Sequence, residues 1–201
     1  MNLAPLIDHT LLKPQATAKD IETLCAQARQ AGFAAVCVLP SRVALAARVL
    51  DGSDVAVCTV VGFPLGSNPT EIKAAETRAV VRLGATEVDM VLDVGAVKDG
   101  DWDAVREDIQ AVVDAARDVP VKVILETALL DDAQKRRAAA IAVECGAAFV
   151  KTSTGTVPDG GATVEDVALL REVVGPRVGV KASGGVKTRE AAEAMVRAGA
   201  T

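Results

Sequence analysis

Two lysines stand inside short apolar segments that we expect to be β-strands. Lys151 lies within residues 149–155, and Lys181 lies within residues 178–185, one strand–helix unit later. Lysine is seldom fully buried without a partner or a task. Two inward lysines at equivalent height in neighbouring parallel strands would repel each other, and repulsion and burial both lower the pKa of an amine. Because a neutral amine attacks carbonyl carbons, the pair predicts Schiff-base chemistry. For either lysine alone, a salt bridge to a strand carboxylate such as Glu126 or Asp89 is an equal alternative.

A carboxylate interrupts another apolar segment of the chain. Asp89 lies within residues 88–91, where it can pass protons to a reacting group or pair with one of the lysines, and the two roles are compatible. Asp93 falls on the same predicted face and is a candidate substitute. The residues Val94 and Gly95 that follow it favour a strand end or a turn instead.

Glycine-containing turns follow both lysine segments. Ser183, Gly184 and Gly185 lead into a predicted helix at residues 188–198, and backbone N–H groups at such a turn favour an anion such as phosphate. Thr154 and Gly155 take the corresponding place after Lys151. A plain strand–helix turn is the alternative for each of these segments.

Short β-branched segments alternate with helical patterns along the whole chain. The predicted strands are residues 6–11, 34–39, 55–61, 87–94, 121–126, 148–153 and 177–182. Helices lie between them, for example at residues 19–31, and the predicted N-caps are Thr17, Ser41, Thr163 and Thr188.

This alternation predicts an α/β fold with a parallel sheet, either an open doubly wound sheet or a closed barrel. No G-x-G-x-x-G follows the first strand, and polar residues recur at many strand ends, so we predict a TIM (β/α)₈ barrel. Only seven strands can be counted, and the eighth is missing. We expect residues 1–201 to form one barrel domain truncated at its C-terminus, with a native seven-strand arrangement as the alternative.

The composition excludes several classes of protein. The 201 residues are 50% hydrophobic with a net charge of −5, which argues against a nucleic-acid surface. No apolar run approaches the roughly 18 residues of a membrane span, and the N-terminus has no signal-peptide pattern. The four cysteines (Cys25, Cys37, Cys58 and Cys145) have no C-x-x-C spacing and are interpreted as reduced core residues of a cytoplasmic protein. The single histidine, His9, makes a zinc-dependent enzyme improbable.

Taken together, these motifs resemble the deoxyribose-phosphate aldolases, a family of class I aldolases, along essentially the whole chain. The segments that carry the resemblance are residues 8–14, 35–38, 62–66, 87–91, 149–155 and 180–186. The resemblance implies reversible cleavage of 2-deoxy-D-ribose 5-phosphate to D-glyceraldehyde 3-phosphate and acetaldehyde, without a metal or other cofactor. It also implies a place in carbohydrate degradation and deoxyribonucleotide catabolism.

The resemblance further implies a role for each candidate residue. Lys151 matches the Schiff-base nucleophile, Lys181 the second lysine that perturbs it and shares in proton transfer, and Asp89 the proton-relay carboxylate. The expected substrate and phosphate contacts are Thr154, Gly155, Gly184 and Gly185. The family continues into an eighth strand and a Gly/Ser-rich phosphate loop, and some members carry a C-terminal tyrosine; none of these is in this sequence. The expected partners are the small-molecule sugar phosphate and acetaldehyde, with no nucleic acid and no membrane, and a homodimer is the candidate assembly.

Two other functions fit parts of the pattern. A Schiff-base lyase acting on a keto-acid phosphate would need a basic residue for the carboxylate, and only Arg177 stands near a strand end. A catalytically inactive fragment, serving as a binding or folding module, is the alternative outside the enzymes.

Overall fold

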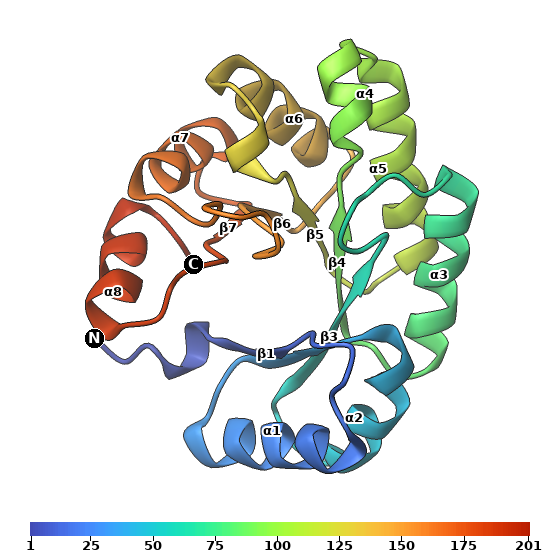
Figure 1. Cartoon of the computed structure of the whole chain (residues 1–201), viewed down its shortest axis with the longest axis vertical. Coiled ribbons are helices and arrows are strands. Elements are labelled where there is room, and N and C mark those ends of the chain that lie inside the picture. Colours follow the sequence, from blue (N-terminus) through green and yellow to red (C-terminus); the bar gives the residue numbers. More distant parts are fainter.

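Seven parallel strands pair in chain order to form one curled sheet (Figure 1). The computed structural model describes all of residues 1–201. Its strands are β1 (Asp8–Leu11), β2 (Ala35–Val38), β3 (Ala56–Val61), β4 (Glu87–Val91), β5 (Val121–Ile124), β6 (Phe149–Lys151) and β7 (Gly179–Lys181). The result is an incomplete TIM-like barrel, which confirms the predicted α/β class and the seven predicted strands.

The helices lie on the outer face of this sheet (Figure 1). They are α1 (Ala18–Ala31), α2 (Val43–Val49), α3 (Thr70–Arg82), α4 (Val94–Asp99), α5 (Trp102–Ala116), α6 (Asp132–Glu144), α7 (Val164–Val174) and α8 (Arg189–Ala198). Short 3₁₀ helices occupy η1 (Ala4–Leu6), η2 (Pro40–Arg42) and η3 (Thr127–Leu129). None of the helices is both long enough and apolar enough to span a membrane.

Three of the four predicted N-caps are confirmed. The side-chain oxygens of Thr17, Thr163 and Thr188 each accept a hydrogen bond from the backbone N–H three residues later. The prediction for Ser41 is wrong, because Ser41 lies inside the 3₁₀ helix η2. Pro40 sets a helical φ one residue earlier, so the chain has already turned before Ser41.

All seven strands are shorter than the sequence pattern predicts, and at two of them the local reason is clear. Leu6 belongs to the 3₁₀ helix η1, which begins beside Pro5. Asp93 is the N-cap of α4, where its Oδ1 accepts hydrogen bonds from Gly95 N at 2.9 Å and Ala96 N at 3.3 Å. Asp93 is therefore a capping residue and not a substitute for Asp89.

The two edges of the sheet are β1 and β7, which do not pair with each other. Thr201 extends alongside β7, where its N–H donates to Val180 O at 3.0 Å and its Oγ1 accepts from Val180 N at 3.2 Å. The N-terminal segment and the C-terminus both lie on the open side of the arc (Figure 1). The opening therefore exposes the barrel interior between β1 and β7.

Alternation along each strand separates an outer core from an inner layer. Val88 and Met90 of β4 pack outward in the continuous core between sheet and helices, so Asp89 points into the barrel. On β2 and β3, Cys37 and Cys58 belong to a small separate inner cluster with Ala35 and Val60. The same period of two places the polar side chains of the inner layer together.

A buried ion pair outside the barrel joins α3 to α5. Lys73 has no exposed surface, and its Nζ lies 2.6 Å from Asp108 Oδ2 and 3.0 Å from Val91 O at the end of β4. Removing one partner of such a pair leaves an uncompensated buried charge.

We therefore expect Asp108→Asn to lower the free energy of unfolding by about 3–5 kcal/mol in urea denaturation. Glu107, an exposed neighbour on α5, gives the control: Glu107→Gln should change the free energy of unfolding by no more than about 0.5 kcal/mol. If Asp108→Asn and Glu107→Gln lowered it equally, the buried ion pair would add no net stability.

Candidate active site

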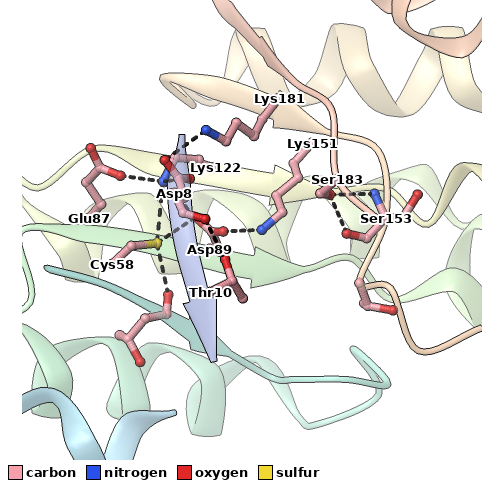
Figure 2. Close-up of polar contacts among 12 residues, drawn as sticks. Asp8, Thr10, Cys58, Glu87, Asp89, Lys122, Lys151, Ser153, Lys181 and Ser183 are labelled. Carbon is pink, nitrogen blue, oxygen red and sulfur yellow. Dashed lines mark hydrogen bonds and ion pairs between the residues drawn. The ribbon is translucent and has the colours of Figure 1, made fainter. Parts of the chain in front are cut away.

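Lys151 and Asp89 meet at the centre of the inner layer (Figure 2). Lys151 Nζ lies 2.5 Å from Asp89 Oδ2, and the aspartate has no exposed surface. In register, Lys151 stands opposite Ile124 of β5, and Ile124 stands opposite Val91 of β4. The lysine therefore starts two residues beyond Asp89, and its long side chain reaches back to the carboxylate. Asp89 therefore forms a salt bridge with a lysine, which is one of the two compatible roles predicted for it.

A third buried lysine, Lys122 of β5, shares the same carboxylate. Its Nζ lies 2.9 Å from Asp89 Oδ1 and 2.5 Å from Glu87 Oε2. Lys122 stands directly opposite Asp89 in the strand register. Sequence reasoning missed it, although the segment Val121-Lys122-Val123-Ile124 places a lysine in an apolar strand just as the segment around Lys151 does. The same signal would have identified it.

Lys181 is held by another carboxylate. It stands opposite Lys151 in the register, so the predicted equal height of the two lysines is confirmed. Its Nζ lies 2.8 Å from Asp8 Oδ1 and 3.0 Å from Leu6 O, on the far side of the opening between β7 and β1. Asp8 Oδ2 also lies 3.8 Å from Lys122 Nζ. Each lysine of the predicted pair thus has its own aspartate (Figure 2).

These contacts overturn the predicted lowering of the Lys151 pKa. Burial is the largest single effect and would lower it, but the negative charge of Asp89, the neighbouring Cys37 and Cys58 and the hydrogen bond to Asp89 together raise the pKa of Lys151 above its ordinary value. Burial would raise the pKa of Asp89, but the positive charges of Lys151 and Lys122 hold this pKa below its ordinary range. Lysine–lysine repulsion was the wrong cause, because each amine of the predicted pair is held by a carboxylate of its own. The resting site is an ion pair.

The inner cysteines lie against this ion pair. Cys58 Sγ is 3.1 Å from Asp89 Oδ1 and 3.4 Å from Lys122 Nζ, and Cys37 stands opposite Cys58 in the register. All four cysteines are free and buried, as expected. Cys25 and Cys145 belong to the outer core, whereas Cys37 and Cys58 belong to the inner layer. Their separation of 21 positions in the sequence gave no indication that they would meet.

A cavity of about 730 Å³ opens over the lysines, between β1, β7 and α8. Six of the seven predicted site residues line it, and only Asp89 lies beneath it: the six are Lys151, Thr154, Gly155, Lys181, Gly184 and Gly185. The turns after β6 and β7 touch backbone to backbone. A Cβ at Gly184, where φ is +81°, would lie 3.0 Å from Gly161 Cα and 3.4 Å from Gly155 Cα. The close approach of these two turns therefore requires glycine.

Glu126 fixes the turn after Lys151. It is no partner of a lysine, contrary to the alternative weighed above. Its carboxylate accepts the N–H of Thr154 at 3.2 and 3.3 Å and also the Thr154 hydroxyl. Glu126 is nearly buried and has a left-handed backbone with φ of 56°. Such a conformation in a residue with a Cβ carries strain, so the surrounding contacts must hold it.

The strain at Glu126 gives a test by paired substitutions. Both Glu126→Ala and Glu126→Gly remove the carboxylate, but only glycine adopts positive φ without cost. We therefore expect the glycine variant to be more stable than the alanine variant by about 1 kcal/mol in chemical denaturation. The reverse order would show that the left-handed conformation is not kept in solution.

The Asp89–Lys151 pair predicts how stability varies with pH. The pKa of Asp89 is lower in the folded chain than in the unfolded chain. The stability that the ionised carboxylate contributes is therefore complete above the unfolded pKa of about 3.9, and it is lost as the pH falls toward the pKa of the folded state. Since the pKa of Lys151 is raised, its contribution is complete below about 10.4 and is lost only as the pH rises through the folded value. The stability gap between the wild type and Asp89→Asn should thus narrow by about 1 kcal/mol as the pH falls from 5 to 3, because the wild type alone loses the ionised carboxylate. An unchanged gap at pH 3 in urea denaturation would contradict the lowered pKa.

The chain is similar to known proteins over its whole length. A family model described as DeoC/LacD family aldolase matches residues 3–201. Deoxyribose-phosphate aldolases from a Geobacillus species and from Brevibacillus brevis are each 58% identical over 201 residues, covering all of this chain and 90% of each relative. Among solved structures, a tetrameric deoxyribose phosphate aldolase from Aeropyrum pernix has a TM-score of 0.91 at 36% identity, covering 98% of this chain and 84% of that one. An aldolase designated QR15 has a TM-score of 0.94 at 39% identity, covering 98% and 88%.

Proposed function

The chain belongs to the DeoC/LacD family of aldolases, and on that premise we propose that it cleaves 2-deoxy-D-ribose 5-phosphate reversibly to D-glyceraldehyde 3-phosphate and acetaldehyde. The observation that carries the proposal is the 2.5 Å contact between Lys151, at the floor of the cavity, and the fully buried Asp89. A lysine in that setting has both a route to the substrate and a group that can take its proton. The expected reaction class is that of a carbon–carbon lyase.

The first step is formation of the Schiff base. In the resting ion pair Lys151 is an ammonium and cannot attack. Transfer of its proton to Asp89 gives a neutral amine, which can attack, and a carboxylic acid; this form is the less populated one, because the charges of the two groups favour the ion pair at rest. The amine then attacks the C1 aldehyde of the open-chain sugar phosphate. Asp89 returns the proton to the departing hydroxyl group, so that water leaves and an iminium ion remains on Lys151.

The second step is cleavage of the C2–C3 bond. Asp89, again a carboxylate, takes the C3 hydroxyl proton through a water molecule, with Lys181 sharing in the transfer. The electrons of the broken bond move into the iminium ion, which leaves the enamine of acetaldehyde on Lys151 and releases D-glyceraldehyde 3-phosphate. Protonation and hydrolysis of the enamine restore the lysine. The iminium ion is the electron sink, so the proposed mechanism needs no metal or other cofactor.

The geometry that supports a role for Lys181 is indirect. Lys181 and Lys122 both contact Asp8, and Lys122 contacts Asp89, so the three lysines and two aspartates form one connected network. The link between Lys122 and Asp8, at 3.8 Å, is an ion pair and not a hydrogen bond, so charge is shared along the whole network and a proton crosses that link only by way of a water molecule. We therefore assign Lys181 to proton transfer and to the electrostatic balance of the network, and Lys151 to nucleophilic attack.

The phosphate end of the substrate is assigned to the two glycine turns. Thr154 and Gly155 follow β6, Gly184 and Gly185 follow β7, and all four face the cavity that Lys151 lines. Backbone N–H groups at glycine turns bind anions well, because no side chain blocks the approach. Residues 184–185 also precede α8, whose N-terminus adds partial positive charge.

We also propose that the chain forms a homodimer and that it lies in the cytoplasm. Its four free cysteines support a reducing compartment. Static light scattering of the purified chain would decide the assembly state.

Product analysis tests the activity itself. The enzyme is incubated with 2-deoxy-D-ribose 5-phosphate, and acetaldehyde and D-glyceraldehyde 3-phosphate are measured by coupled dehydrogenase assays. The same assay with 2-deoxy-D-ribose isolates the contribution of the phosphate group. We expect a large preference for the phosphorylated sugar; equal rates would remove the assignment of Gly184 and Gly185, and no acetaldehyde from either sugar would refute the proposed activity.

A further inference from the structure

Two buried thiols converge on Asp89 from the side opposite Lys151. The sulfur atoms of Cys37 and Cys58 and one carboxylate oxygen of Asp89 all lie within 4.8 Å of one another, and none of the three residues has exposed surface. Figure 2 shows Cys58 pointing at the carboxylate from β3. The catalytic proposal uses neither cysteine, so the arrangement is unexplained by it.

The spacing fits a single ion better than a disulfide. Zinc binds thiolate sulfur at about 2.3 Å and carboxylate oxygen at about 2.0–2.2 Å, so the ligand atoms of one ion lie roughly 3–4 Å apart. In the trio, Cys58 Sγ already lies 3.1 Å from Asp89 Oδ1, and no two of the ligand atoms are more than 4.8 Å apart. A disulfide needs Cβ atoms about 3.8 Å apart. Cys37 and Cys58 are directly opposed on neighbouring parallel strands, which lie about 4.8 Å apart and hold the two side chains parallel. This separation is larger than a disulfide requires.

The charge balance of the site also permits a cation. When a divalent cation binds, the two thiols release two protons and the ion brings two positive charges. The net charge of the buried cluster is therefore the same before and after binding. Lys122 Nζ, at 3.4 Å from Cys58 Sγ, stabilises the thiolate that forms.

We propose that Cys37, Cys58 and Asp89 form an inhibitory binding site for a thiophilic divalent cation such as Zn²⁺ or Cd²⁺. The ion is bound by two thiolates and one carboxylate oxygen. Because Asp89 Oδ1 then coordinates the ion, the carboxylate is drawn away from Lys122 and its proton exchange with Lys151 is blocked. The binding itself stands on the geometry, whereas its effect on the lysine rests on the proposed function.

Titration of the full chain with CdCl₂ tests the binding without any activity assay. We expect ultraviolet thiolate-to-cadmium charge-transfer absorbance that saturates at one ion per chain, with two protons released per ion. Cys37→Ser and Cys58→Ser, singly and together, should abolish the absorbance or weaken the apparent affinity by about 100-fold or more. The matched controls Cys25→Ser and Cys145→Ser replace equally hidden thiols of the outer core and should bind as the wild type does.

The outcomes separate the two parts of the proposal. Equal absorbance changes in the inner and outer cysteine variants, or no charge-transfer band in the wild type, would overturn the site. Release of fewer than two protons per ion by the unaltered chain would also overturn the site, whether or not a serine variant folds. Borohydride trapping of acetaldehyde on Lys151 should be lost in the presence of CdCl₂ and restored by a chelator. Trapping that continues in the cadmium-saturated chain would overturn the inhibition while leaving the binding intact.

Discussion

Lys151→Ala should lower kcat/KM for cleavage of 2-deoxy-D-ribose 5-phosphate by about 10⁴-fold or more, since removal of a covalent nucleophile costs effects of this size in other enzymes. No other amine replaces it: Lys122 is held by Glu87 and Asp89, and Lys181 is held by Asp8. The variant should still fold, because Asp89 keeps Lys122 at 2.9 Å and Cys58 at 3.1 Å as partners.

Steady-state kinetics with a coupled aldehyde assay measures this effect. Lys19→Ala, an exposed lysine on α1, is the matched control and should retain wild-type activity. Lys181→Ala should lose activity as well but should still form the acetaldehyde adduct on Lys151, because its role lies in proton transfer. If Lys151→Ala retained more than about a tenth of the wild-type kcat/KM, Lys151 could not be the nucleophile.

Asp89→Asn should be the most damaging single change at the site for stability and activity together. The amide leaves the buried ammonium group of Lys151 without a carboxylate partner, whereas Lys122 keeps Glu87 at 2.5 Å. Breaking a buried pair in this way costs about 3–5 kcal/mol, because the remaining charge has no compensation. The same change removes the group that takes and returns the proton of Lys151, so we expect kcat to fall by about 10²–10⁴-fold.

Urea denaturation at pH 7 and single-turnover kinetics measure the two effects separately. Asp93→Asn is a close control four positions along the chain, because asparagine caps a helix as well as aspartate does. That variant should be within about 0.5 kcal/mol of the wild type. If Asp89→Asn lost activity but no stability, the ion pair would contribute nothing net to the fold, and the strong coupling between Asp89 and its lysines would be refuted.

Much of this site follows from the period of two in buried strands. Lysine or aspartate between β-branched residues, as at Lys151, Lys181 and Asp89, must point to the face opposite its apolar neighbours, and in a barrel that face is the interior. The equal height of the two lysines follows from corresponding positions in successive strand–helix units. The turns with Gly155 and Gly184 follow from the same register.

The pairing of charges could not be predicted in this way. Which amine meets which carboxylate depends on how far each strand is staggered against its neighbours, and the sequence carries no record of the stagger. Lys151 reaches Asp89 only because it starts two residues beyond it. The predicted sign of the Lys151 pKa shift was wrong for that reason: repulsion between lysines was counted, and the carboxylate that pairs with Lys151 was not. Glu126 was misjudged for a different reason, since its left-handed backbone turns the side chain toward Thr154.

Borohydride trapping with acetaldehyde, followed by peptide mapping, tests the central claim most directly. The enzyme is mixed with acetaldehyde, reduced, digested and analysed by mass spectrometry for a lysine that carries an added ethyl group. We predict a single modified position, Lys151, with the label absent from Lys151→Ala and retained in Lys19→Ala. An ethyl group on Lys122 or Lys181 in the wild type, or no modified lysine at all, would contradict the account.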